Sequence, residues 1–163
     1  MRRLGLIAAA IVLTALISSA ARNRAKPASP SAVLEAYVHA WNQHDSAAFD
    51  TLFAPDGVHE DLAQGFTGRG SSDVKGFLRE LLKVEPDFRW QLTSVFERGP
   101  NVAGEWTWRA TYTGPGPSGP VTARPISGRG VSLAVIERGR IKRFTDYYDA
   151  VSFFTVPADS THH

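Results

Sequence analysis

Two stretches in the first half of the chain carry apolar residues three or four positions apart, the spacing of one buried helix face. The first stretch begins after Ser29 and Pro30, a pair typical of a helix start. Its expected buried stripe is Val33, Tyr37, Ala40 and Trp41. The second stretch begins at Ser71 or Ser72, and Pro86 prevents its continuation as a helix.

A short helix and a short strand are expected between these two helices. Asp45 is suited to cap the short helix, whose inward-facing residues would be Phe49, Leu52 and Phe53. The triplet Pro55-Asp56-Gly57 is typical of a turn. Residues 58–62 would then form the strand, and residues 65–70 a loop that leads to the next helix.

From residue 88 onward the pattern alternates between apolar and polar residues, which predicts β-strands. Turns are expected at residues 98–101, in the proline- and glycine-rich segment 114–120, and at Arg138-Gly139. The first strand would carry one face made of Phe88, Trp90, Leu92 and Phe96. The second would carry Val102, Trp106, Trp108 and Tyr112 on one face, and a third strand would cover residues 130–137.

Helices followed by an antiparallel run of strands indicate an α+β fold. The expected architecture is a cone-shaped, curved antiparallel sheet with about three helices packed on its concave side. A sheet that curls around helices encloses a cavity, and mostly apolar cavities with a few polar groups are common ligand sites.

The first residues have the composition of an export signal. Arg2 and Arg3 precede an uninterrupted run of apolar or small residues. Residues 1–21 are therefore interpreted either as a cleaved signal peptide, giving a secreted or periplasmic protein, or as an N-terminal membrane anchor. We expect a linker at 22–30, one folded domain at 31–155 and a disordered tail at 156–163.

Composition excludes several classes of function. The chain has 18 Lys and Arg against 16 Asp and Glu, and no cysteine. Without Arg2 and Arg3 the charges balance, and no basic stripe remains, so nucleic-acid binding is not expected. No glycine-rich phosphate loop is present, and the residues His59-Glu60-Asp61 cannot all converge on one ion. We therefore expect no metal and no cofactor.

The last strand carries the first candidate catalytic residue. With a period of two, Phe144, Asp146 and Tyr148 share one face, so an acid lies between two aromatic rings. A carboxylate in such surroundings loses hydration, and acids of this kind are candidates for functional groups. The alternative is an Asp at a frayed strand end or one paired with an Arg.

Three further side chains are candidate catalytic residues. His59 and Asp61 share one face of the short strand, and Tyr37 on the first helix could donate a hydrogen bond to an oxyanion. The alternatives are a surface His, an Asp that holds the following loop, and a core Tyr. The aromatic residues expected to contact a hydrophobic substrate are Trp41, Phe88, Trp90, Trp106, Trp108, Phe144 and Tyr148.

The sequence, with its order of predicted elements and these residues, resembles the SnoaL-like polyketide cyclases and the steroid Δ5-isomerases of the nuclear-transport-factor-2-like fold. The resemblance covers about residues 31–154 and rests on segments 37–42, 52–58, 60–61, 66–70, 105–107, 127–131 and 139–141. It implies that Asp61 is the proton-shuttling base of an isomerase and Tyr37 its oxyanion donor, while Val131 replaces a second acid. It also implies that Asp146 is the general base of a cyclase.

Two functions follow as expectations. The first is a cofactor-free isomerase or cyclase that removes a proton next to a carbonyl group of a hydrophobic small molecule. The second is a non-catalytic module that binds a small ligand or forms a homodimer through its outer sheet face, where Thr107, Arg109 and Thr111 would lie. Membrane contact is expected only through the N-terminal segment.

Overall fold

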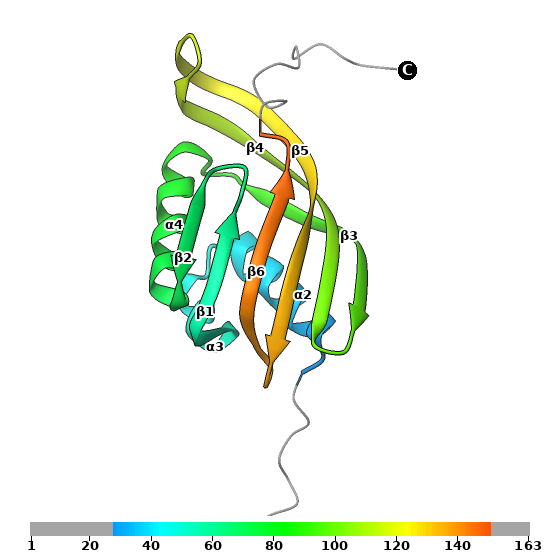
Figure 1. The fold of residues 1–163 in the computed structure, drawn as a ribbon. Coiled ribbons are helices and arrows are strands. Elements are labelled where there is room, and N and C mark those ends of the chain that lie inside the picture. The colour runs from blue at the N-terminus through cyan, green and yellow to red at the C-terminus, as the bar shows by residue number, and fades with distance from the viewer. Residues whose placement is uncertain (1–27, 151–163) are drawn as a thin grey trace, which may run out of the picture.

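The computed structural model describes residues 28–150, which form a curved six-stranded sheet with helices on one side (Figure 1). The expected signal or anchor, nearly all of the linker and the tail lie outside these residues. Within residues 28–150, no helix combines the length and hydrophobicity needed to cross a bilayer.

The helices begin and end close to the positions that the sequence predicts. Helix α2 spans Pro30–Asn42, and the Ser29 side chain caps it by accepting a hydrogen bond from the Ala32 backbone N–H at 3.2 Å. The 3-10 helix η1 (Ser46–Ala48) and helix α3 (Phe49–Leu52) follow the predicted cap Asp45. Helix α4 covers Gly70–Val84 and ends two residues before a proline.

The strands lie in the order β2-β1-β6-β5-β4-β3 across the sheet. Their bounds are β1 Phe53–Asp61, β2 Phe66–Arg69, β3 Arg89–Arg98, β4 Asn101–Gly116, β5 Gly119–Glu137 and β6 Arg140–Tyr148. All neighbours are antiparallel except β1 and β6, which are parallel. The α+β class with helices on one face of a curved sheet is confirmed, and the parallel pair makes the sheet mixed.

One predicted turn is wrong, and another is shorter than expected. Pro55-Asp56-Gly57 lies inside β1, where the register against β6 shifts between Phe53 and Val58. A Cβ atom on Gly57 would lie 2.6 Å from the Ile141 carbonyl oxygen, so glycine allows the close approach of β6 there. The proline-rich segment 114–120 is mostly strand, because β4 and β5 stay paired up to Gly116 and Gly119 and form a projecting hairpin (Figure 1).

Two further details of the prediction need correction. Part of the loop expected at residues 65–70 is the edge strand β2. In β3 a register shift between Leu92 and Ser94 interrupts the alternation, and Phe96 consequently lies on the outer face with 63% exposure. Phe88, expected on the same face, precedes the strand.

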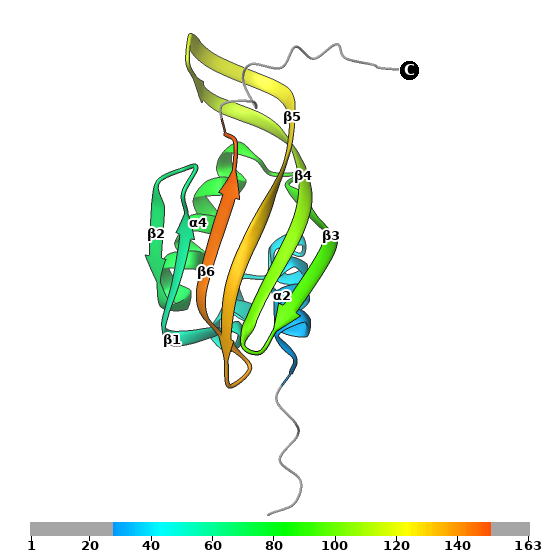
Figure 2. The ribbon, with the colours of Figure 1, turned by 45° about the vertical axis from the view of Figure 1, so that its right-hand side comes forward.

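The core lies between the concave sheet face and the helices (Figure 2). Helix α2 packs mainly against β3, and α4 packs against β1. Every residue of the predicted α2 stripe is buried. Tyr37 of this stripe and Phe144 of β6 are completely buried in the core. This arrangement leaves the inward faces of the central strands partly covered by α4, and the candidate site lies there.

Candidate active site

A cavity of about 420 Å³ lies between the concave sheet face and the helices α2 and α4. Its walls are largely aromatic, and all four tryptophans of the chain line it: Trp41, Trp90, Trp106 and Trp108. The polar side chains on its wall include three acids that are at least nine-tenths buried, Asp61, Asp146 and Glu85, together with buried His59. The volume suits a small organic molecule.

Strand register brings the polar side chains together. Asp61 on β1 lies beside Asp146 on the parallel strand β6, and Ser132 on β5 lies beside Asp146 on its other side. Residues directly opposite one another in a sheet point to the same face. The three side chains therefore form a row across three adjacent strands, with His59 two residues before Asp61 on the same face.

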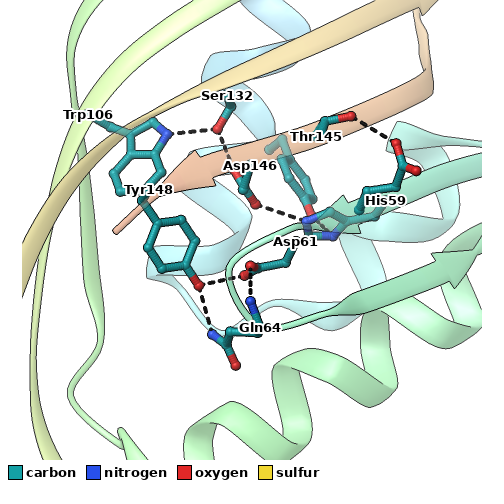
Figure 3. Close-up of polar contacts among 10 residues, drawn as sticks. His59, Asp61, Gln64, Trp106, Ser132, Thr145, Asp146 and Tyr148 are labelled. Atoms are coloured by element: carbon teal, nitrogen blue, oxygen red, sulfur yellow. Dashed lines mark hydrogen bonds and ion pairs between the residues drawn. The ribbon is translucent and has the colours of Figure 1, made fainter. Parts of the chain in front are cut away.

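The Asp146 carboxylate accepts two hydrogen bonds. His59 Nε2 lies 3.0 Å from Asp146 Oδ2, and Ser132 Oγ lies 2.5 Å from Asp146 Oδ1 (Figure 3). Trp106 Nε1 is in turn 2.7 Å from Ser132 Oγ. An indole nitrogen can only donate, so the Ser132 hydroxyl accepts from Trp106 and donates its own proton to Asp146. These contacts fix the orientation of the carboxylate.

Tyr37 extends this chain on the other side of His59. Its hydroxyl lies 3.2 Å from His59 Nδ1, while His59 Nε2 faces Asp146. A neutral imidazole with its proton on Nε2 satisfies both contacts, because Nδ1 then accepts from the Tyr37 hydroxyl. Burial raises the pKa of Tyr37 well above its ordinary value, and the charge of Asp146 adds to the rise. Tyr37 is therefore a stable donor.

Asp61 has a separate set of partners. Its Oδ1 accepts from the Gln64 backbone N–H at 2.9 Å, and its Oδ2 accepts from the Tyr148 hydroxyl at 2.8 Å (Figure 3). Asp61 thus holds the loop after β1 and also lines the cavity. Burial raises the pKa of Asp61 above its ordinary value, and the two hydrogen bonds oppose the rise without cancelling it.

The structure places nine of the eleven predicted site residues on the cavity wall: Trp41, His59, Asp61, Phe88, Trp90, Trp106, Trp108, Asp146 and Tyr148. Tyr37 and Phe144 do not line it. Both are completely buried in the core behind His59, with their ring centroids 4.8 Å apart. Tyr37 can therefore act on a bound molecule only through His59.

Sequence reasoning missed several polar residues of the site, among them Gln64, Glu85 and Ser132. For Ser132 the sequence contained one indication. The short turn at Arg138-Gly139 sets the approximate pairing of β5 with β6, and this pairing brings the residues around Ser132 close to Asp146. Glu85 follows the last residue of α4 and directly precedes Pro86, a position that leaves the helical conformation. Neither signal indicates that the side chain reaches a cavity.

Among residues 28–150, no three His, Asp or Glu side chains are arranged to hold a metal ion. Asp61 and Asp146 on the cavity wall form hydrogen bonds with protein groups, whereas Glu85 forms none with the described residues. The polar side chains on this wall are carboxyl, imidazole, amide and hydroxyl groups.

Comparison with known proteins identifies the family. The model of the SnoaL-like polyketide cyclase family matches residues 31–155. The chain belongs to the SnoaL-like polyketide cyclase family. The resemblance inferred from the sequence is thus confirmed. A search of curated proteins gives no match.

Solved structures share the fold of this SnoaL-like chain. A hypothetical protein from Catenulispora acidiphila, with a ketosteroid isomerase-like fold and in complex with trimethylamine, is 24% identical with a TM-score of 0.66, covering 80% of this chain and 97% of its own. Wild-type IdmH from Streptomyces antibioticus is 22% identical with a TM-score of 0.68, covering 77% and 96%. A SnoaL-like polyketide cyclase from Agrobacterium tumefaciens is 18% identical with a TM-score of 0.64, covering 76% and 94%.

Proposed function

We propose that this protein is a cofactor-independent acid–base catalyst of the cyclase or isomerase type, acting on a hydrophobic carbonyl compound. The observation that carries the proposal is the pairing of two buried carboxyl groups, Asp61 and Asp146, on adjacent strands of an aromatic cavity wall. Membership of the SnoaL-like polyketide cyclase family supports this type of reaction.

Asp146 is the proposed base. It removes a proton from the carbon next to the substrate carbonyl: the C–H bond breaks, the proton goes to a carboxylate oxygen, and the electron pair becomes the enolate. In an isomerisation Asp146 returns the proton to another carbon. In a cyclisation the enolate carbon attacks a second carbonyl carbon, and the alkoxide formed takes the proton. A well-placed group of this kind contributes about 10²–10⁴-fold in rate.

Asp61 is the proposed acid. Burial raises the pKa of Asp61 and so favours its protonated form, and a protonated carboxyl can donate to the developing oxyanion. Two carboxyl groups with different surroundings can divide the acid and base roles in this way. His59 and Ser132 are positioning residues, because each contacts Asp146 and holds its carboxylate in one orientation.

The test is turnover of a cyclic β,γ-unsaturated ketone, followed by the ultraviolet absorbance of the conjugated product. Asp146→Asn should lower kcat by about 10²–10⁴-fold. Asn offers one acceptor oxygen where Asp146 accepts two hydrogen bonds, so turnover is normalised to the folded fraction measured by urea unfolding. Asp149→Asn is the matched control, since Asp149 is exposed just beyond β6 and does not line the cavity. Equal turnover by Asp146→Asn and the wild type would remove Asp146 from the mechanism.

The same experiment addresses the alternative of a non-catalytic binding module. Because all four tryptophans line the cavity, intrinsic fluorescence reports whether a ketone occupies it. Binding without any conversion by the wild type, over a series of cyclic and polyketide-like ketones, would favour a ligand-binding module. The expected export and the expected homodimer stay predictions.

A further inference from the structure

Glu85 is a further acid in the wall of the cavity. It is 8% exposed and lines the cavity at the end of α4. Within residues 28–150 its carboxylate accepts no hydrogen bond and forms no ion pair, whereas Asp61 and Asp146 each accept two hydrogen bonds. The carboxylate oxygens of Glu85 are not among the fully buried atoms that lack a partner, so they keep some contact with solvent, but the residue as a whole has lost most of its hydration, which is costly for a carboxylate.

The electrostatic surroundings of Glu85 favour a positive charge. Burial raises the pKa of Glu85 to about 7, and the charge of Asp87 adds to this rise. Exposed Glu80, five residues earlier on α4, also lines the cavity. No Lys or Arg is among the described residues of the cavity wall. Glu85 also caps the C-terminal end of α4, where the helix dipole is negative.

Aromatic rings complete these surroundings. The backbone N–H of Phe88 donates to the Glu85 carbonyl at 3.2 Å, which keeps the two residues together. The Phe88 ring stacks on Trp108 with centroids 5.9 Å apart, and its centroid lies 6.0 Å from that of Trp41. All three rings line the cavity. The faces of aromatic rings attract organic cations, and cages of such rings recognise quaternary ammonium groups.

We propose that the cavity binds an organic cation, an amine or quaternary ammonium group, with Glu85 as its counter-ion. The inference rests on the proposed function in that it describes the substrate of the same cavity: a carbonyl compound whose remote end carries positive charge. The cationic end would lie against Glu85 and Phe88, while the reacting carbons lie against the β1–β6–β5 wall that carries Asp146. Glu85 is thus a specificity-determining residue.

The test compares a cation with its neutral isostere. Choline and 3,3-dimethylbutan-1-ol have nearly the same shape, and only choline is charged. Titration at about pH 8, where Glu85 is mostly ionised, should show choline binding at least about tenfold more tightly. Glu85→Gln should remove this preference by weakening choline binding and should leave the alcohol within about twofold. Glu35→Gln, which changes an exposed acid of α2 that does not line the cavity, is the control and should retain the preference.

A pH series adds a second readout. Choline does not titrate, so its affinity should rise about tenfold from pH 6 to pH 8 as Glu85 ionises, and Glu85→Gln should lose this rise. The neighbouring acids Glu80 and Asp87 do not contribute to this change in affinity, because they do not titrate between pH 6 and pH 8. Lys83 lowers the pKa of Glu80, and hydrogen bonds from Thr111 lower that of Asp87, so both stay charged in this range.

The outcomes separate this inference from the proposed reaction. Equal binding of choline and the alcohol, no binding of choline, or an unchanged preference in Glu85→Gln would each overturn it. Asp146→Asn should retain choline binding, because the cation contacts a different wall. Failure of the proposed reaction would appear as unaffected turnover in that variant, independently of the choline titration.

Discussion

Replacing Glu85 by Gln should change the pH dependence of stability in a direction that the structure fixes. In the unfolded chain the Glu85 carboxyl has its ordinary pKa of 4.5, whereas burial raises the pKa to about 7 in the folded protein. Between these values the folded state binds more protons than the unfolded state. The free energy of unfolding therefore falls as pH rises through this window, and the loss is complete above pH 7.

The magnitude follows from the two pKa values. Each tenfold change in acidity corresponds to about 1.4 kcal/mol, so ionised Glu85 lowers the free energy of unfolding by up to about 3 kcal/mol at pH 8. Gln has nearly the same shape and cannot ionise. Glu85→Gln should therefore match the wild type near pH 4.5 and exceed its stability by up to this amount near pH 8.

Urea unfolding followed by tryptophan fluorescence, from about pH 4.5 to about pH 8, measures this difference. The raised pKa of Asp61 acts in the same direction, but it is common to both proteins and cancels in the comparison. Glu80→Gln is the matched control, because this exposed acid forms an ion pair with Lys83 and should not gain stability at high pH. Parallel profiles for Glu85→Gln and the wild type would refute the reasoning.

Two further substitutions test the packing and hydrogen bonds of the site by urea unfolding. Ser132→Ala should lower the free energy of unfolding by about 1.5–3 kcal/mol, because it leaves the buried Trp106 N–H without an acceptor. Its control is Thr145→Val on the neighbouring strand β6. This change removes the hydrogen bond from Thr145 to Glu60 on the outer face of the sheet and should lower the free energy of unfolding by about 1 kcal/mol or less. Gly130→Ala should cost about 1–3 kcal/mol and shift the tryptophan emission, since its Cβ would lie 2.5 Å from the Trp106 ring. Gly76→Ala in α4, whose Cβ would meet nothing closer than 3.7 Å, should instead stabilise by about 0.5–1 kcal/mol. Equal effects within either pair would contradict the geometry.

Local patterns predicted the parts of the site that depend on one element. The period of two in the last strand correctly places Asp146 and Tyr148 on the cavity face. The same period places His59 and Asp61 on one face, and the structure shows that this face is buried. Helix caps fix the start of α2, because side-chain capping is a property of a few consecutive residues.

Register shifts explain what the patterns could not predict. A regular β5–β6 hairpin continuing from the pair Glu137 and Arg140 would place Val131 opposite Asp146. The shift between Val135 and Ile136 moves the pairing by one residue, so Ser132 takes that place. One extra residue thus replaces an apolar neighbour of the candidate base with a hydroxyl donor. No composition or period specifies such a shift, because it depends on how the whole sheet curves.

The two ends of the cavity wall differ in a way that bears on function. The hydrogen bonds of Asp146 are all supplied by the protein, so its geometry is complete before any ligand binds, as a catalytic group requires. Glu85 is equally buried but has no protein partner among the described residues, and at neutral pH it lowers stability. Groups that reduce stability without serving the fold are typical of sites shaped for function. The partner that Glu85 lacks among these residues is therefore best sought in the ligand, and the negative charge of Glu85 predicts that this partner is positive.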